Sequence, residues 1–267
     1  MLTIRQSAVA GVFYPENPVS LRECVSQHIS AGQQTHAPIS SRPKALIVPH
    51  AGYEYSGPIA GTAYAQLLPI ADSIERVVLL GPSHHVGFSG LATSGANYFE
   101  TPLGDVPIDT ERVEDLQSLP EVTLLDEAHA SEHSLEVQLP FLQVALPNSF
   151  KLIPLVVGMA TTKQIAEVID FTWGGPETLF VVSSDLSHYK DYATAQKIDL
   201  QTTKMIESLQ FDELSGERAC GFAGIQGLLN IAKHLGLRVT TLDLRNSGDT
   251  SIRHDHVVGY GAYVVHD

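Results

Sequence analysis

Four stretches of the chain are almost wholly apolar and are short enough to form β-strands. They cover residues 45–48, 76–80, 152–157 and 179–182. Polar residues do not interrupt them at every second position, so the pattern predicts strands buried on both faces rather than strands with one solvated face. Strands of this kind are typical of a mostly parallel sheet that helices cover on both sides.

Segments with helical periodicity alternate with these strands. The first begins at Asn17-Pro18, an N-cap followed by proline at the first helical position, and ends near Gly32. Another approaches Leu146, and Pro140 within it marks a kink or a late helix start. Further helices are expected at residues 56–68, 110–119, 162–172, 193–209 and 222–235. A turn-rich hairpin at residues 91–109 and two terminal strands at 238–244 and 257–265 indicate a mixed sheet.

This alternation predicts an α/β fold: a three-layer α/β/α sandwich around a mixed, mostly parallel sheet. Residues 5–15 have no clear period and are expected to wrap the fold as an extended arm. The chain has 267 residues, of which 43% are hydrophobic, so it can build a large core. No stretch of it has the composition of a linker between domains, and we expect one domain spanning residues 1–267.

The charge and the apolar runs exclude several classes of partner. The formal net charge is -14, which argues against a nucleic-acid partner, because phosphate backbones need a basic face. No apolar run is long enough to span a bilayer, and the N-terminal residues lack the order of a secretory signal. With only two cysteines, Cys24 and Cys220, we expect a cytoplasmic protein whose thiols are reduced.

Histidines follow three of the four predicted strands. His50 ends the motif VPH, His84 and His85 end GPSHH, and Asp185 and His188 lie in SSDLSH. Parallel strands bring their carboxyl ends to one edge of the sheet, where ligands bind in open α/β folds, so we expect these side chains to share a pocket. His133, at a predicted helix start, and Cys220, just before another, could reach the same place.

Each of these residues also has a structural interpretation. A single histidine after a strand is more often a hydrogen-bonded structural residue, and Cys24 falls on the apolar face of its helix. Three strand ends with imidazoles favour a convergent site. Two histidines and a carboxylate are typical of Fe(II) sites, whereas Cys220 in place of the carboxylate would shift the preference toward zinc or copper. A histidine outside the metal site, such as His188, could act as general acid or base.

Other catalytic classes lack their motifs here. The chain has no P-loop, no G-x-G-x-x-G between a strand and a helix, and no G-x-S-x-G elbow. It also has neither HExxH nor a cluster of carboxylates for paired metals, which argues against a zinc hydrolase.

Taken in order, a set of motifs resembles the Memo family, also called AmmeMemoRadiSam system protein B. The resemblance extends from Arg5 to about Val265. The motifs are RQSAVAGVFYP, ALIVPHAGYEYSG, VVLLGPSHH, TPLGDVPID, EHSLEVQLPFL, VVSSDLSHY, Cys220-Gly221 and NSGD. The resemblance implies a fold shared with LigB-type, class III extradiol dioxygenases, in which two histidines and a glutamate hold non-haem iron.

The family's site carries over to this chain position by position. It implies His50, His84 and Cys220 as metal ligands, with Fe(II) expected first and copper or zinc as alternatives. It also implies His188 as the acid–base. Two more residues belong to the implied catalytic set, Asp185 and His133, and two others are expected to line the pocket, His85 and Tyr53. Because Cys220 replaces the glutamate ligand of the dioxygenases, the resemblance does not by itself imply ring cleavage.

The sequence leaves two classes of function open. The first is a metal-dependent oxidoreductase, resembling extradiol dioxygenases, that acts on a small molecule or a modified peptide. The second is a non-catalytic metal- or peptide-binding module, since animal Memo proteins are linked to binding of phosphotyrosine peptides. The resemblance also implies radical-SAM and AMMECR-type proteins as partners of bacterial and archaeal members.

Overall fold

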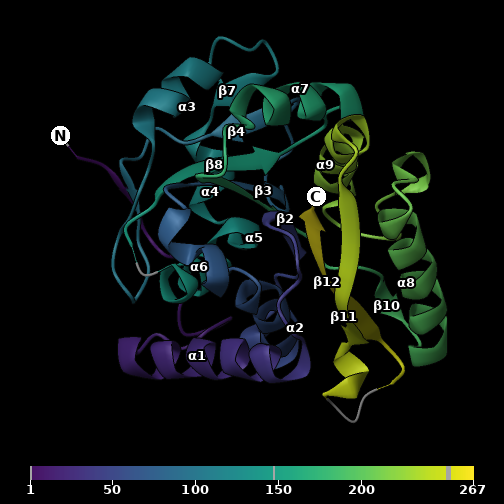
Figure 1. The fold of residues 1–267 in the computed structure, drawn as a ribbon. Helices are drawn as coiled ribbons and strands as arrows, with labels where there is room; N and C mark the ends of the chain where they lie inside the picture. The colour runs from purple at the N-terminus through teal and green to yellow at the C-terminus, as the bar shows by residue number, and fades with distance from the viewer. Residues whose placement is uncertain (1, 147, 251–253) are drawn as a thin grey trace.

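The protein is built around one large mixed sheet, shown as a computed structural model in Figure 1. The structure describes residues 2–146, 148–250 and 254–267. Within these residues the sheet consists of β2 (Pro43–Val48), β3 (Arg76–Pro82), β4 (Leu91–Thr93), β7 (Val122–Leu124), β8 (Lys151–Val157), β9 (Thr178–Ser183), β10 (His188–Lys190), β11 (Arg238–Asn246) and β12 (Val257–His266). Their spatial order is β10-β12-β2-β9-β3-β8-β4-β7, and β11 pairs with β12.

The four central strands β2, β9, β3 and β8 are parallel and correspond to the four apolar stretches of the sequence. On either side of them β12 and β4 run antiparallel, which makes the sheet mixed. Because β9 lies between β2 and β3, the segments that follow these three strands meet at one edge of the sheet. The predicted fold class is therefore confirmed.

Helices cover both faces of the sheet. They are α1 (Pro18–Thr35), α2 (Tyr53–Ala65), α3 (Thr110–Leu116), α4 (Asp126–Ala130), α5 (His133–Glu136), α6 (Leu139–Ala145), α7 (Thr162–Thr172), α8 (Tyr192–Glu207) and α9 (Phe222–Leu235), with short 3-10 turns at Leu68–Ser73, Phe211–Glu213 and Ser247–Asp249. On the first face lie α2 and α6, with α1 packed against these two helices, and on the second face lie α7, α8 and α9 (Figure 1).

Successive residues of the central strands belong to opposite cores. In β9, Leu179 and Val181 face the α1 side, whereas Phe180 and Val182 face the α9 side. All four are at most 1% exposed, which explains why these strands are continuously apolar. No helix within the described residues is long and apolar enough to cross a membrane.

Several local features differ from the sequence prediction. The expected hairpin divides. β5 (Tyr98–Phe99) pairs with β6 (Val106–Pro107) on one side and with β1 (Ile4–Arg5) on the other in a separate small sheet, while β4 joins the main sheet. Helix α2 begins at Tyr53, earlier than the predicted Ser56, and the Tyr53 N–H donates to Phe13 O of the arm. Pro140 occupies the first turn of α6, so the late helix start is confirmed.

A buried ion pair fastens the N-terminal arm to the segment that carries α5. The Arg5 guanidinium pairs with the Glu136 carboxylate and also donates to the carbonyl oxygens of His129 and Glu132 at 3.0 and 2.7 Å. Three more donors of the arm reach the same carboxylate: the N–H groups of Ala8 and Val9 and the hydroxyl of Tyr14. The side chains of Arg5 and Glu136 are 6% and 0% exposed, so each charge depends on the other for compensation.

Removing the arginine should destabilise the fold strongly. In Arg5→Met, Glu136 keeps its neutral donors but loses the only opposite charge paired with it in the described structure, and we expect a loss of about 3–5 kcal/mol in the free energy of unfolding. The matched control is Arg112→Met, whose pair with Asp115 is about half exposed and should contribute at most ~1 kcal/mol. Urea denaturation followed by circular dichroism measures both. Similar losses in the two variants would contradict a structural role for the buried pair.

Candidate metal centre

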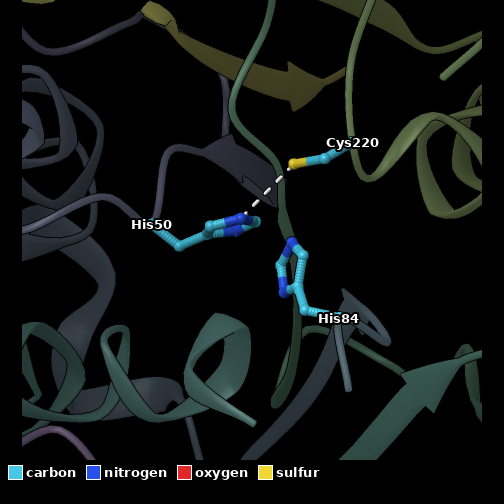
Figure 2. Close-up of side chains that lie close together, drawn as sticks. All are labelled: His50, His84 and Cys220. Atoms are coloured by element: carbon cyan, nitrogen blue, oxygen red, sulfur yellow. Dashed lines mark hydrogen bonds between the residues drawn. The ribbon is translucent and has the colours of Figure 1, made fainter. Parts of the chain in front are cut away.

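Two histidines and a cysteine converge at the carboxyl edge of the central strands (Figure 2). His50 follows β2, His84 follows β3, and Cys220 precedes α9 on the opposite side of the edge. One ligand atom from each lies within 4.8 Å of the others. His50 Nε2 and Cys220 Sγ are 3.3 Å apart. The structure thus brings together three side chains that are separated by up to 170 residues in the sequence.

The hydrogen bonds around His50 determine which of its nitrogens carries the proton. Its Nδ1 lies 2.9 Å from Ser183 Oγ. The Ser183 hydroxyl already donates its proton to Ser134 O at 2.6 Å and accepts from Gln138 Nε2 at 2.8 Å. With that proton used, Nδ1–H of His50 must donate to Ser183, which leaves Nε2 unprotonated and directed at Cys220. Burial, and then the charge of His84, lowers the pKa of His50 to about 3, so the ring is neutral.

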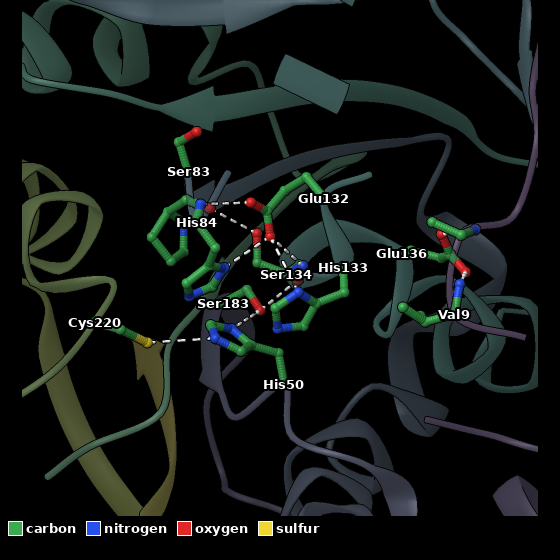
Figure 3. A network of polar contacts seen from close by, with 12 residues as sticks. Val9, His50, Ser83, His84, Glu132, His133, Ser134, Glu136, Ser183 and Cys220 are labelled. Atoms are coloured by element: carbon green, nitrogen blue, oxygen red, sulfur yellow. Dashed lines mark hydrogen bonds and ion pairs between the residues drawn. The ribbon is translucent and has the colours of Figure 1, made fainter. Parts of the chain in front are cut away.

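His84 is oriented in a similar way, by a carboxylate. Its Nδ1 lies 2.8 Å from Glu132 Oε1, and its backbone N–H donates to Glu132 Oε2 at 2.6 Å (Figure 3). Nδ1 is therefore the donor, and Nε2 is the nitrogen available to a proton or a metal. Burial opposes a charge on His84, but the hydrogen bond and the charge of Glu132 outweigh it and raise the pKa of His84. A metal ion at Nε2 would replace the proton that this nitrogen carries when the His84 ring is charged.

A second group that could hold a metal consists of His84, Glu132 and His133. Its carboxylate is already occupied by donors, because Glu132 accepts from the His84 ring, from His84 N and from Ser134 N at 2.9 Å. Burial alone would raise the pKa of Glu132, but these bonds and the charge of His84 lower it to about 2. A metal in this group would have to displace the His84 Nδ1–H. The group of His50, His84 and Cys220 needs no such rearrangement.

The Cys220 sulfur is held by the loop after β9. It accepts the Asp185 N–H at 3.3 Å, and the Cys220 N–H donates back to Asp185 O at 3.3 Å. Burial, and then the negative charge of Asp185, raises the pKa of the Cys220 thiol to about 12. The thiol is therefore protonated and donates to His50 Nε2. A metal ion there would replace this proton and stabilise the thiolate.

The donor set fits a transition-metal ion. Two neutral imidazole nitrogens and one sulfur suit iron, copper and zinc, and exclude the all-oxygen coordination that calcium and magnesium prefer. Both imidazoles are held through their other nitrogen by an acceptor, as is usual for histidine ligands of metals. The two imidazoles can therefore bind a metal ion through Nε2 and keep these acceptors, and only the hydrogen bond between Cys220 and His50 is given up.

Asp185 and His133 lie beside this group. Asp185 is 5% exposed and its Oδ1 accepts the His50 N–H at 2.8 Å; burial raises its pKa despite this bond. The His133 ring stacks on His84 with centroids 4.6 Å apart and meets His50 edge-on at 5.4 Å. Burial, and then the charge of His50, lowers the pKa of His133 to about 4, which keeps this imidazole neutral, like that of His50.

The remaining predicted residues are not part of this group of three ligands. His188 does not end β9; it opens β10, five residues after Ser183, and its Nδ1 lies 2.8 Å from Leu186 O. His85 is exposed, and its ring centroid is 6.5 Å from that of His84. Tyr53 was expected to line the pocket, but it lies in the core at 2% exposure, with its hydroxyl donating to Val137 O. The difference arises because Tyr53 starts α2 and its ring packs against Phe141.

Sequence reasoning overlooked the residues that orient the imidazoles. Glu132 precedes His133 in the motif EHSLE, and Ser183 is the last residue of β9. Gln138 supports them by donating to Ser183 Oγ and to Pro49 O, both at 2.8 Å. A carboxylate next to a histidine and a serine at a strand end are weak signals by themselves. Their partners are 48 and 133 residues away, and the fold alone brings them together.

Comparisons with known proteins give the fold and the family. The crystal structure of an uncharacterized protein from Escherichia coli K12 resembles this chain with a TM-score of 0.52 and 13% identity, covering 84% of this chain and 100% of that one. At this identity the likeness concerns the fold alone.

Relatives of higher identity span nearly the whole chain. A MEMO1 family protein of Sulfolobus acidocaldarius is 36% identical and covers 96% of this chain and 97% of its own. Another, from Thermoplasma volcanium, is 34% identical and covers 98% of each. A third, from Methanocaldococcus jannaschii, is 36% identical and covers 99% and 100%. The family of Memo-like proteins matches residues 5–264. This chain therefore belongs to the Memo-like protein family.

Proposed function

We propose that the protein binds one transition-metal ion through His50 Nε2, His84 Nε2 and Cys220 Sγ and uses it in oxidoreductase chemistry on a small molecule. One observation carries the proposal: both rings donate Nδ1–H to a fixed acceptor, so both Nε2 atoms remain for a ligand next to the sulfur. A purely structural cluster would not require both rings to bond a fixed acceptor through the same nitrogen and to leave the other for a ligand.

Iron(II) is the proposed ion, with copper and zinc as alternatives. The family resemblance favours iron, whereas the sulfur ligand makes the donor set softer than that of a site with two histidines and a carboxylate. When bound, a redox-active ion would supply electron transfer and Lewis-acid chemistry at this edge of the sheet. The neutral rings of His50 and His133 keep positive charge away from the site and so favour binding of a cation.

Three side chains outside the ligand set complete the proposed site. His188 is the proposed acid–base: its Nδ1–H donates to Leu186 O, and its Nε2 remains to accept or return a proton. Asp185 fixes the backbone of His50 and the position of Cys220, so its role is to hold ligands in place. His133 stacks on His84 and limits the rotation of that ring.

Loss of the sulfur ligand should weaken metal binding. We expect Cys220→Ser to bind Zn(II) and Fe(II) at least a hundredfold more weakly, because a serine hydroxyl stays protonated near neutral pH and is a poor soft ligand. Anaerobic competition with a chelator measures the affinity. The control is Cys24→Ser, which removes the other free thiol, on α1, and should bind both ions like the wild type. Equal affinity in Cys220→Ser and the wild type would remove Cys220 from the ligand set.

Replacing the carboxylate that orients His84 should have a smaller effect. In Glu132→Gln, the NH₂ group of the amide faces one of the N–H groups of His84 that the carboxylate binds, and that hydrogen bond is lost. Because the His84 ring is then held less firmly, we expect metal affinity to fall about 10–100-fold. Glu127→Gln, an exposed position on the neighbouring α4, is the control and should leave affinity unchanged. If Glu132→Gln abolished binding as fully as His84→Ala, Glu132 would itself be a ligand, and the group of His84, Glu132 and His133 would be the true site.

A variant of His188 should affect turnover without affecting metal binding. We expect His188→Gln to keep metal affinity within about threefold of the wild type, while oxygen uptake by the Fe(II)-loaded protein with a panel of catechols falls roughly a hundred- to ten-thousand-fold. Glutamine keeps a donor and an acceptor but does not exchange a proton at neutral pH. His234→Gln, exposed in the last turn of α9, is the control. Unchanged oxygen uptake in His188→Gln would rule out its acid–base role.

A further inference from the structure

A chamber of about 310 Å³ adjoins the candidate metal centre on the α9 side of the sheet. The loop after β3 contributes Phe88, the end of β8 contributes Val157, and the first turn of α9 contributes Phe222 and Ala223. Its volume lies at the lower end of the range of sites for small molecules. The chamber is therefore large enough for a compact organic molecule and too small for a folded peptide segment.

The inner end of the chamber reaches the candidate centre. Ser183 and Cys220 both line it. Cys220 is one of the three grouped ligand residues, and Ser183 is the acceptor that fixes the His50 ring. A molecule in the chamber would therefore contact the side of the site on which the sulfur lies.

Among the residues that the structure describes, no charged side chain lines the chamber. Three residues of the lining carry polar side chains, Ser83, Ser183 and Cys220, and both serine hydroxyl protons are already donated, to Val86 O and Ser134 O. A charged ligand would lose its hydration without gaining a charged side chain of the lining as its partner. Phosphate groups in particular are recognised by arginine or lysine, and the chamber offers neither.

We propose that this chamber selects an uncharged, largely apolar small molecule and places it against Cys220 and the metal. Phe88 and Phe222 supply aromatic surface for a flat ring, and Val157 supplies aliphatic surface. The placement beside the metal rests on the proposed function, whereas the selection for neutral ligands rests on the chamber lining alone. A phosphorylated peptide does not fit this lining.

The test compares probes of one shape and different charge. 1-Naphthol is neutral, 1-naphthoate is an anion and 1-naphthylmethylammonium is a cation; phenyl phosphate represents a phosphotyrosine head group. Titration calorimetry on the full chain, prepared without metal, gives each affinity for the chamber itself. We expect 1-naphthol to bind at least tenfold more tightly than either charged naphthalene and phenyl phosphate to bind weakest. Equal or tighter binding of 1-naphthoate or phenyl phosphate would overturn the proposal.

A second test introduces a charged side chain into the chamber lining, to show whether the probes bind there. Ala223 is the second residue of α9, where an aspartate suits the helix N-terminus and should not impair folding. Ala223→Asp should weaken 1-naphthol at least tenfold and reverse the order of 1-naphthol and the cation. The control is Ala193→Asp, also the second residue of its helix, but exposed on α8 and outside the chamber lining; it should bind all probes like the wild type. Undiminished 1-naphthol binding in Ala223→Asp would place the ligand elsewhere and overturn the proposal.

Metal affinity distinguishes this proposal from the proposed function. If Cys220→Ser loses the metal while the wild type fails to prefer 1-naphthol, the chamber proposal fails and the metal site stands. If 1-naphthol binding is lost in Ala223→Asp while Cys220→Ser retains metal affinity, the chamber proposal stands and the ligand set is wrong.

Discussion

The direction of two imidazole rings is the constraint on which the candidate site depends. His50 and His84 each donate Nδ1–H to a fixed oxygen, Ser183 Oγ in one case and Glu132 Oε1 in the other. Their Nε2 atoms are then left facing the Cys220 sulfur. Without these acceptors each ring could turn or change tautomer, and the three ligand atoms would no longer form a group. The acceptors in turn need the parallel order β2, β9, β3, because it sets Ser183 between the two histidines.

The N-terminal arm takes part in the same arrangement. Arg5 pairs with Glu136 and donates to the carbonyl of Glu132, so it ties the arm to both ends of the segment that orients His84. The cost of burying these charges is offset by their mutual attraction and by the donors of the arm. Damage to the arm should therefore reach the metal centre through the position of Glu132, although the arm contributes no ligand.

The sequence predicted the parts of this structure that local pattern controls. Continuous apolar runs such as residues 179–182 identified the central strands, because burial on both faces leaves no polar positions. Pro140 located the start of α6 for the local reason that proline suits a first helical turn. The strand-end rule also indicated the edge at which His50 and His84 meet.

What the sequence did not reveal depends on contacts between distant segments. The roles of Ser183 and Glu132 follow from which proton each group has free, and that depends on Ser134, Gln138 and the tautomers of two rings. His188 was expected directly after β9, but an intervening loop carries it to β10. Tyr53 was expected to line the pocket, yet the start of α2 turns its ring into the core.

The most direct test of the metal centre is X-ray absorption spectroscopy of the protein loaded anaerobically with Fe(II) or Zn(II). Two imidazoles and one thiolate predict a sulfur scatterer at about 2.3 Å and nitrogen scatterers at about 2.1 Å, judged by zinc sites. The sulfur contribution should vanish in Cys220→Ser and persist in Cys24→Ser. A wild-type spectrum with nitrogen and oxygen scatterers only would contradict the proposed site, because it would leave Cys220 outside the coordination sphere.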